Sequence, residues 1–389
     1  MTHADAIVVG AGVIGASCAF HLARAGLRVT VVDRGEAAGA GSTARATGGF
    51  RAQYATSINV RLSLLARERL AALADETGVD PGFRKVGYLW LATSAAELAE
   101  LRAANELQRR EGLREAELVG PYELCAINPY IETAGLVGGA WCPTDGVLRP
   151  TEVQRGYLEA AQRLGVVVRW GEPVTALERG AGDPVPAITA VVTPRGRTPA
   201  GLVVNAAGAW AAAVARLAGI ELPVVPLRRQ VAITEPTEAL PSAFPMTIWA
   251  GDGFHLRVRD GRVLLLRPTP GDPQDPFCDR VDPRWLDDIA ATAPARVPAL
   301  SGVRLDRAHA WAGLYEMSPD HHALLGWAPG CPNLLLVNGS SGHGVMHAPA
   351  LGLLAAEIAV HGAARSLDVG ALRPSRFAEG DPVRGSALL

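Results

Sequence analysis

Lysine is nearly absent from this chain of 389 residues. Lys85 is the single lysine among 37 basic side chains, and all the others are arginine. An arginine cannot be deprotonated under ordinary conditions, so it does not replace a lysine amine as base or nucleophile. Any mechanism that needs a lysine amine must therefore use Lys85.

Cysteine is also scarce, and its spacing excludes several classes of protein. The 5 cysteines are odd in number and widely scattered, with no CxxC pair. Zinc sites, redox dithiols and disulfide frameworks need closer or paired cysteines. Near its start the chain has the acidic Asp5, where a signal peptide has basic residues. We therefore expect a cytoplasmic protein in a reducing compartment.

Charge and hydropathy indicate neither a nucleic-acid partner nor a membrane span. The 37 basic and 39 acidic side chains leave a net charge of -2, too little to attract nucleic acid or an anionic membrane surface. The longest apolar stretch, residues 200–227, is interrupted by Asn205, Arg216, Glu221 and two prolines. A stretch broken in this way cannot cross a bilayer as one helix.

The apolar content, 49%, is enough for the cores of two or more domains. Residues 6–33 have the pattern of a strand, a helix and a second strand. Helical spacing recurs at 58–76 and 95–110, where we expect a second domain to begin, and again at 152–164 and 345–361. Short strands separated by Pro, Gly and Asp between residues 223 and 314 predict an antiparallel sheet.

The first strand and helix are joined by a glycine motif. Gly10, Gly12 and Gly15 form GxGxxG, and Asp33 ends the next strand. The first glycine permits a tight turn, the second lets a pyrophosphate approach the backbone, and the third lets helix and strand pack closely. The helix N-terminus offers N–H groups to phosphates, while Asp33 can accept hydrogen bonds from ribose hydroxyls and repels a 2′-phosphate. The motif predicts NAD or FAD rather than NADP.

Further segments favour FAD through a resemblance. They are residues 41–51 (GSTARATGGFR), 145–150 (DGVLRP), 205–210 (NAAGAW), 314–326 (LYEMSPDHHALLG) and 338–344 (NGSSGHG). With the glycine motif, they resemble the FAD-dependent amine oxidoreductases of the D-amino acid oxidase superfamily, and most closely the sarcosine oxidase β-subunit and proline dehydrogenase branch. The resemblance spans nearly the whole chain.

The resemblance implies an α/β fold with two domains. A Rossmann-like FAD-binding domain would comprise residues 1–80, 145–222 and 315–389, and a substrate domain with a mixed or antiparallel sheet would comprise 81–144 and 223–314. The turn at 342–344 would lie beside the flavin pyrimidine edge, where negative charge develops. The residues expected to contact FAD are Gly10, Gly12, Val13, Ile14, Gly15, Asp33, Arg34, Ser42, Thr43, Arg45, Ala46, Thr47, Gly48, Gly49, Val174, Ala207, Gly208, Trp210, Gly313, Gly339, Ser341, Gly342, His343, Gly344 and Val345.

We expect the FAD to be noncovalent. Members of the superfamily that bind flavin covalently do so through a cysteine or histidine, at positions that match Gly313, Arg45 and Pro150 here. None of these three side chains can form the bond.

Two lysines of the related oxidases are missing as well. Met346 stands where sarcosine oxidases have a lysine that helps to bind the substrate carboxylate, and the oxygen-activating lysine would fall near Leu265. A cation beside the flavin promotes electron transfer to oxygen because it stabilises superoxide. Unless an arginine or histidine substitutes, we expect a dehydrogenase that reduces another acceptor.

Arg51 matches a carboxylate-binding arginine of sarcosine oxidases and is the expected substrate ligand, since a guanidinium can bind a carboxylate through two hydrogen bonds. The expected catalytic set is completed by His343, His255, Tyr315 and Met346, although a core or rim position is the commoner role for residues such as His255 and Tyr315.

We expect no metal. His343 and His347 have the four-residue spacing of ligands on one helix face, but no third ligand accompanies them.

The expected reaction transfers hydride to flavin N5 from the carbon beside a neutral amine, and it gives an imine. The substrate would be a small secondary amine or amino acid such as sarcosine, proline or another N-methyl amino acid. Two alternatives stay open. One is a primary amine substrate, as in glycine oxidase or D-amino acid dehydrogenase. The other is a weakly active flavoprotein that serves as a subunit or assembly factor of a larger complex.

Overall fold

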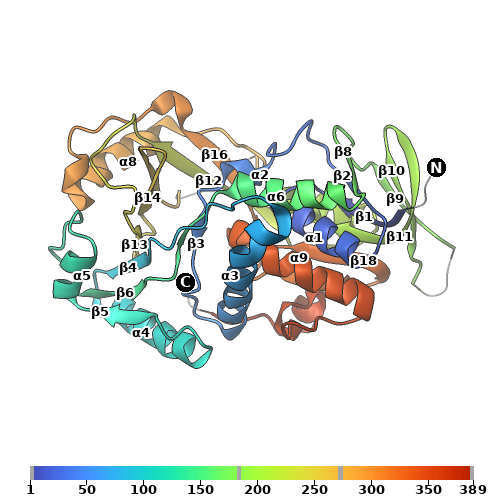
Figure 1. Cartoon of the computed structure of the whole chain (residues 1–389), viewed down its shortest axis with the longest axis horizontal. Helices are drawn as coiled ribbons and strands as arrows, with labels where there is room; N and C mark the ends of the chain where they lie inside the picture. Colours follow the sequence, from blue (N-terminus) through green and yellow to red (C-terminus); the bar gives the residue numbers. More distant parts are fainter. Residues whose placement is uncertain (1–3, 182–184, 270–274, 386–389) are drawn as a thin grey trace.

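Two eight-stranded sheets organise the computed structural model, which describes residues 4–181, 185–269 and 275–385. The outermost residues of the expected domain limits, 1–3 and 386–389, lie outside these described residues. Figure 1 shows the two sheets in opposite halves of an elongated molecule. The helices are α1 (Val13–Arg24), α2 (Ser42–Arg45), α3 (Ser57–Thr77), α4 (Ala95–Arg110), α5 (Pro121–Ile127), α6 (Pro150–Arg163), α7 (Ala211–Arg216), α8 (Pro283–Arg296) and α9 (Gly344–His361).

The first sheet is parallel at its centre. Its strand order is β17-β18-β11-β1-β2-β8, with β10 and β9 continuing from β11, and β17 runs antiparallel to β18. The strands are β1 (Ala4–Val9), β2 (Val29–Val32), β8 (Val167–Arg169), β9 (Ala176–Arg179), β10 (Ile188–Thr193), β11 (Gly196–Asn205), β17 (Leu324–Ala328) and β18 (Cys331–Asn338).

Both faces of this sheet are buried, which explains why β1 is apolar from Ala6 to Val9. Ala6 and Val8 pack with the helices on one face, while Ile7 and Val9 pack on the other. Successive side chains of a strand point to opposite faces, so both sets of side chains are buried when a parallel strand is covered on both sides.

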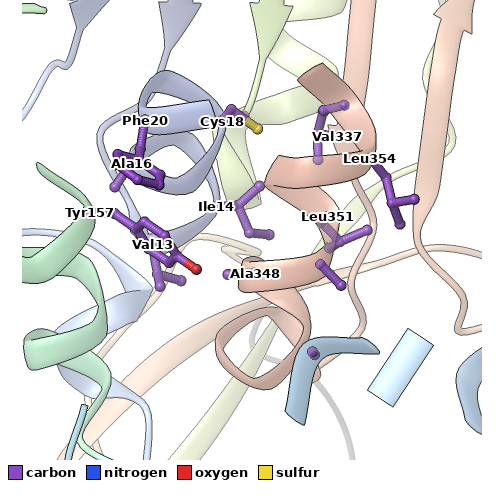
Figure 2. Packing of buried hydrophobic residues seen from close by; sticks show 14 of the residues in the cluster. Val13, Ile14, Ala16, Cys18, Phe20, Tyr157, Val337, Ala348, Leu351 and Leu354 are labelled. Atoms are coloured by element: carbon purple, nitrogen blue, oxygen red, sulfur yellow. The ribbon is translucent and has the colours of Figure 1, made fainter. Parts of the chain in front are cut away.

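Helix α9 is the centre of the helical layer. It packs against α1 and α3, and Figure 2 shows Ala348, Leu351 and Leu354 of α9 beside Val13 and Ile14 of α1. Among the described residues, α9 is the one helix long and apolar enough to cross a membrane, but 61% of it is buried inside the protein. Its contacts are those of a core helix.

The second sheet is mostly antiparallel, as the short strands predicted. Its strand order is β16-β12-β15-β14-β13-β4-β6-β5, and only β13 and β4 pair in parallel. A separate two-stranded antiparallel sheet joins β3 to β7. The strands are β3 (Gly49–Phe50), β4 (Tyr88–Ala92), β5 (Glu117–Val119), β6 (Gly138–Cys142), β7 (Gly146–Val147), β12 (Val225–Ile233), β13 (Met246–Trp249), β14 (His255–Arg259), β15 (Arg262–Leu266) and β16 (Trp311–Met317).

The two faces of the second sheet have different roles. Leu89, Leu91 and Leu265 pack in one apolar cluster with α8. The intervening residues Tyr88 and Trp90 belong to the opposite face, which lines a cavity. Alternation along the strands thus separates a structural face from a face that is open to a ligand.

Two details of the expected organisation are different in the structure. Helix α3 does not begin a second domain, because it packs against α9 and α6 of the first. The expected limit between residues 314 and 315 falls inside β16, because this strand continues to Met317 opposite Val225 of β12.

Candidate active site

A cavity of about 1120 Å³ lies where the two sheets meet, lined by residues of both. Pockets for small ligands usually measure about 300–1,000 Å³, so this one has room for a dinucleotide and a small substrate. One end is formed by the first turn of the chain and the end of β2. The other end is formed by the open face of the second sheet, and the loop before α9 lies beside the first turn of α1.

The three glycines of the first turn are required for different reasons. Gly10 has a φ of +103°, and a Cβ there would lie 2.4 Å from the carbonyl oxygen of Ala206. A Cβ on Gly15 would lie 1.9 Å from the carbonyl oxygen of Gly10, so Gly15 permits helix packing and does not line the cavity. Gly12 has an ordinary φ of −61°, and its Cβ would meet only Thr43 Oγ1, at 3.5 Å. Nothing in the protein itself requires glycine at position 12, so the space above it is available to a ligand.

Asp33 holds the turn as well as lining the cavity. The backbone N–H of Ala11 donates to Asp33 Oδ2 at 2.6 Å, and that of Gly35 donates to Oδ1 at 2.7 Å. A carboxylate has about four acceptor sites, so two remain for hydroxyl groups of a ligand. The sequence analysis missed Gln154, whose Nε2 donates to the carbonyl oxygen of Ala11 at 2.6 Å and supports the same turn.

Two helix N-termini meet at the cavity. Helices α1 and α9 begin after Gly12 and His343, neither of which caps its helix with a side chain. A Cβ on Gly344 would lie 3.4 Å from Ile14 Cδ1, so the first turns of the two helices are close together. Each offers backbone N–H groups and a positive dipole end to negative charge.

Segment 41–51 crosses between the two sheets and is anchored at several points. Ser42 Oγ donates to the carbonyl oxygen of Leu314 at 2.6 Å. Arg257 of β14, another residue that the sequence analysis missed, donates through Nη1 to the carbonyl oxygens of Thr47 at 2.6 Å and Gly48 at 2.9 Å. Burial lowers the pKa of Arg257 to about 10. The segment is thus held by buried contacts.

Arg51 is a buried cation that forms no ion pair with the described residues. Its Nη1 donates to the carbonyl oxygen of Gln53 at 2.8 Å, and its guanidinium lies 4.1 Å from the Tyr54 ring and 5.0 Å from the Trp90 ring. No carboxylate of the described residues forms an ion pair with it, although the side chain is only 8% exposed. Since a buried charge is costly unless it is paired, the cavity is suited to an anionic ligand at this point.

His343 lies next to Arg51, with Nε2 3.4 Å from Nη2 of the guanidinium. Burial, and then the charge of Arg51, lower the pKa of His343 well below its ordinary value, so the imidazole is neutral. Its ring packs edge-on against Tyr54, at 4.9 Å between centroids. The Tyr54 hydroxyl is directed to Met346 Sδ at 3.1 Å.

The spacing of His343 and His347 does not make a metal site. His347 Nε2 lies 2.8 Å from Ser63 Oγ, in the packing between α9 and α3 and away from the cavity lining. Within residues 4–181, 185–269 and 275–385, no group of three His, Cys, Asp or Glu side chains could hold a metal ion.

His255 and Tyr315 both line the cavity. His255 Nδ1 lies 2.8 Å from the carbonyl oxygen of Gly253, which can only accept, so Nδ1 carries the proton and Nε2 is an acceptor. Burial lowers the pKa of His255 to about 4, so this imidazole is also neutral. The Tyr315 ring packs closely on Gly342, where a Cβ would lie 2.5 Å from Tyr315 Cε2.

The wall opposite the α9 loop includes apolar and aromatic residues that the sequence analysis missed. Tyr88, Trp90, Met246 and Ile248 line the cavity from adjacent strands, because Met246 pairs with Tyr88 and Ile248 with Trp90. Their spacing of two residues in each strand, typical of one face of a sheet, was the available signal. Arg229 of β12 was also missed.

Nearly all of the expected site residues line the cavity, and Gly339 is the exception besides Gly15. Gly339 has a φ of +68°, and a Cβ there would lie 2.3 Å from Leu324 Cδ1. It therefore serves the turn after β18 and does not line the cavity.

The two positions at which the related oxidases carry lysine lie in different surroundings here. Met346 lines the cavity, but Leu265 points into the core beside α8, and its neighbour Leu266 is the residue that reaches the cavity. A shift of one residue in a strand exchanges the two faces. Lys85 is exposed and outside the cavity lining.

The residues fit a noncovalent FAD. Two of the positions at which relatives carry a linking residue, Arg45 and Gly313, are adjacent, since a Cβ on Gly313 would lie 3.0 Å from Arg45 Cβ. None of the cysteines lines the cavity. The open space above Gly12, the two helix N-termini and Asp33 would hold the diphosphate and ribose of a dinucleotide.

Comparison with known proteins agrees with this geometry. The family model "DAO: FAD dependent oxidoreductase" matches residues 5–358. FAD-dependent oxidoreductase domain-containing protein 1 of Xenopus laevis is 28% identical and covers 98% of this chain and 84% of that protein. Mitochondrial dimethylglycine dehydrogenase of Mus musculus is 27% identical over 96% of this chain, but over only 44% of its own length. The crystal structure of L-proline dehydrogenase from P. horikoshii has a TM-score of 0.89 at 27% identity, covering 98% of this chain and 99% of that one. The chain belongs to the DAO family of FAD-dependent oxidoreductases.

Proposed function

We propose that this oxidoreductase oxidises the C–N bond of a small secondary amine or amino acid, of the sarcosine, proline or N-methyl amino acid type, to an imine. The observation that carries the proposal is Arg51, a buried guanidinium that no described carboxylate pairs and that faces the cavity among aromatic rings. The names of two similar proteins, dimethylglycine dehydrogenase and L-proline dehydrogenase, support the same class of substrate.

FAD, held by the first turn, Asp33 and the loop before α9, would supply the acceptor for hydride from the carbon beside the amine nitrogen. The protein's task is mainly orientation. Arg51 binds the substrate carboxylate, and Tyr88, Trp90 and Ile248 form a dry wall that holds the C–H bond in place. Excluding water also prevents early hydrolysis of the product imine.

The amine must lose its proton before hydride can leave, because only the neutral nitrogen has a lone pair to share with the carbon. His255 and His343 are both neutral, since burial is the main cause of their low pKa values. Because both imidazoles are neutral, neither lowers the pKa of the bound amine through its charge. His255 Nε2 is a hydrogen-bond acceptor, so it can orient the amine N–H. His255 is thus a substrate-orienting residue in this proposal.

We further propose a dehydrogenase of the cytoplasm that passes electrons to an acceptor other than oxygen, either a separate carrier or a partner subunit. The absence of a lysine from the cavity lining supports this choice, because Leu266 stands at the wall where a lysine cation would stabilise superoxide. Arg51 and Arg229 also line the cavity, and we assign their charges to acidic groups of the substrate rather than to oxygen.

An anaerobic amine screen tests the proposal. The holoenzyme is mixed with sarcosine, N-methyl amino acids, proline, glycine and D-alanine, and the loss of flavin absorbance is followed. Secondary amino acids are expected to bleach the flavin fastest. Faster bleaching by glycine or D-alanine would instead support a primary amine substrate. No bleaching by any amine, by a protein that holds FAD, would contradict catalysis by the isolated chain.

A further inference from the structure

Five arginines line the cavity, and they differ in whether the protein neutralises them. They are Arg34, Arg45, Arg51, Arg229 and Arg267. Arg45 and Arg267 form ion pairs with aspartates. Arg34 follows β2 at the dinucleotide end, with its guanidinium 4.0 Å from the Trp210 ring. Arg51 and Arg229 remain, and no carboxylate of the described residues pairs with either.

Arg229 is held by weak contacts that leave its charge available. It lies on β12 opposite Gly313 of β16. Its Nη1 donates to the carbonyl oxygen of Arg228 at 3.1 Å, and its guanidinium lies 5.6 Å from the Tyr315 ring. A cation over an aromatic face is stabilised only modestly, which does not replace an anionic partner.

The two unpaired guanidinium groups approach the substrate end from opposite sides. In the second sheet, one strand separates β14 from β12, and one strand separates β14 from β4 on the other side. β12 carries Arg229, and β4 carries Trp90, whose ring lies under the Arg51 guanidinium. His255 of β14 lies between them. After burial, the charges of Arg51 and Arg229 both lower the pKa of His255, and both act on Tyr315 too.

We propose that the substrate carries a second acidic group, which Arg229 binds on the side of the cavity opposite Arg51. The substrate would be a secondary amino acid with a further carboxylate, placed on the nitrogen substituent or on the side chain. This inference rests on the proposed amine oxidation. The buried guanidinium of Arg51 is costly while it is unpaired, and the half-buried guanidinium of Arg229 is free to bind an anion. A diacidic substrate pairs both of them while its amine lies over His255.

Binding of inert acids tests Arg229 independently of turnover. The holoenzyme is titrated with acetate, succinate and glutarate, and the shift in flavin absorbance gives each Kd. The diacids are expected to bind roughly 10- to 100-fold more tightly than acetate, the range for an added charged hydrogen-bonding pair. Arg229→Gln is expected to remove most of that difference, and Arg229→Lys to keep part of it.

Arg228→Gln is the matched control, because Arg228 is adjacent in the strand but outside the cavity lining. Its Nη1 donates to the carbonyl oxygen of Arg280 at 2.8 Å. The control is expected to bind diacids as the unaltered protein does. Diacids that bind no tighter than acetate, or an Arg229→Gln variant that folds and binds them unchanged, would overturn the inference.

Anaerobic flavin reduction separates this inference from the proposed function. Iminodiacetate and N-methylaspartate are compared with sarcosine, and the diacidic amines are expected to have the higher kcat/KM. If sarcosine reduces the flavin fastest and Arg229→Gln has no effect, the second acidic group is wrong while amine oxidation stands. If no amine reduces the flavin but diacids still bind through Arg229, the diacid site stands while amine oxidation fails.

Discussion

Arg51 makes the substrate prediction testable at the scale of one residue. Arg51→Met keeps an apolar stem against Tyr54 and Trp90 but removes the charge. We expect KM for amino acid substrates to rise roughly 10- to 100-fold, since hydrogen bonds to a charged group contribute about 1.5–3 kcal/mol. Steady-state kinetics measures this, with Arg61→Met as control because Arg61 is exposed and pairs with Glu111. An unchanged KM would remove Arg51 from the binding site.

The carboxyl group of Asp145, close to Arg51 in the fold, makes the free energy of unfolding depend on pH. Asp145 accepts hydrogen bonds from the backbone N–H of Ala52 at 2.9 Å and from Gln53 Nε2 at 3.4 Å, and burial raises its pKa from 3.8 to about 7. Between these two values the unfolded chain releases a proton that the folded protein keeps. The contribution of Asp145 to the free energy of unfolding therefore falls as the pH rises from about 4 to about 7.

Asp145→Asn cannot ionise, so it should lack this part of the pH dependence. Urea unfolding at several pH values measures the free energy of unfolding for both proteins. The curves are expected to converge or cross as the pH rises, because only the unaltered protein has the falling contribution. Glu117→Gln, a change at an exposed strand residue, serves as control. Parallel curves for Asp145→Asn and the unaltered protein would contradict the assignment.

At the scale of elements, the contact between α1 and α9 controls the two helix N-termini that meet at the cavity. Gly352 of α9 lies directly on Ser17 of α1, where a Cβ would come within 2.1 Å of Ser17 Oγ and 2.5 Å of the Ser17 carbonyl carbon. The helices can approach this closely only because residue 352 has no side chain. The same contact continues into the apolar packing that Figure 2 shows.

Gly352→Ala is expected to destabilise the protein by about 1–3 kcal/mol, the usual cost of overpacking. Alanine normally stabilises a helix relative to glycine by about 1 kcal/mol, so the sign of the effect distinguishes the two causes. Thermal or urea unfolding measures it. Val360→Ala, on the exposed side of α9, is expected to change stability by less than about 0.5 kcal/mol. A more stable Gly352→Ala variant would show that the helices can separate at no cost.

Which acceptor takes the electrons from the reduced flavin depends on the whole molecule. We expect the reduced protein to react slowly with air-saturated buffer in stopped-flow measurements. Leu266→Lys adds a cation at the cavity wall and is expected to accelerate this reaction by roughly tenfold or more. Leu266→Met, which adds no charge, is the control. Rapid reoxidation of the unaltered protein would exclude the dehydrogenase proposal.

Retention of the cofactor is tested on the whole molecule as well. Because Gly313, Arg45 and Pro150 cannot form a covalent bond to the flavin, acid precipitation is expected to leave the yellow colour in the supernatant. Colour that stays with the pellet would identify a covalent bond through another side chain.

Features with local causes could be predicted from the sequence. The GxGxxG turn, Asp33 and the SGHG turn are defined by neighbours within a few residues. The periodicity of α6 follows from its one buried face, and the nearly continuous apolar sequences of α1 and α9 follow from burial on almost all sides. The family resemblance added Arg51, which lies in the cavity. Gly339, expected in the site, lies outside the cavity lining because its backbone serves a turn packed on Leu324.

The sequence by itself determined that the chain has a dinucleotide-binding turn, a buried parallel sheet and an antiparallel second sheet. Backbone sterics and apolar periodicity act over short separations, and both are visible in order along the chain. Only the tertiary structure decided which arginines remain without an anion. Arg45 is paired with Asp279, far away in the sequence, whereas Arg229 has no such partner among the described residues. Pairing and burial depend on residues that folding brings together, so the charge available to a substrate emerges only in the folded molecule.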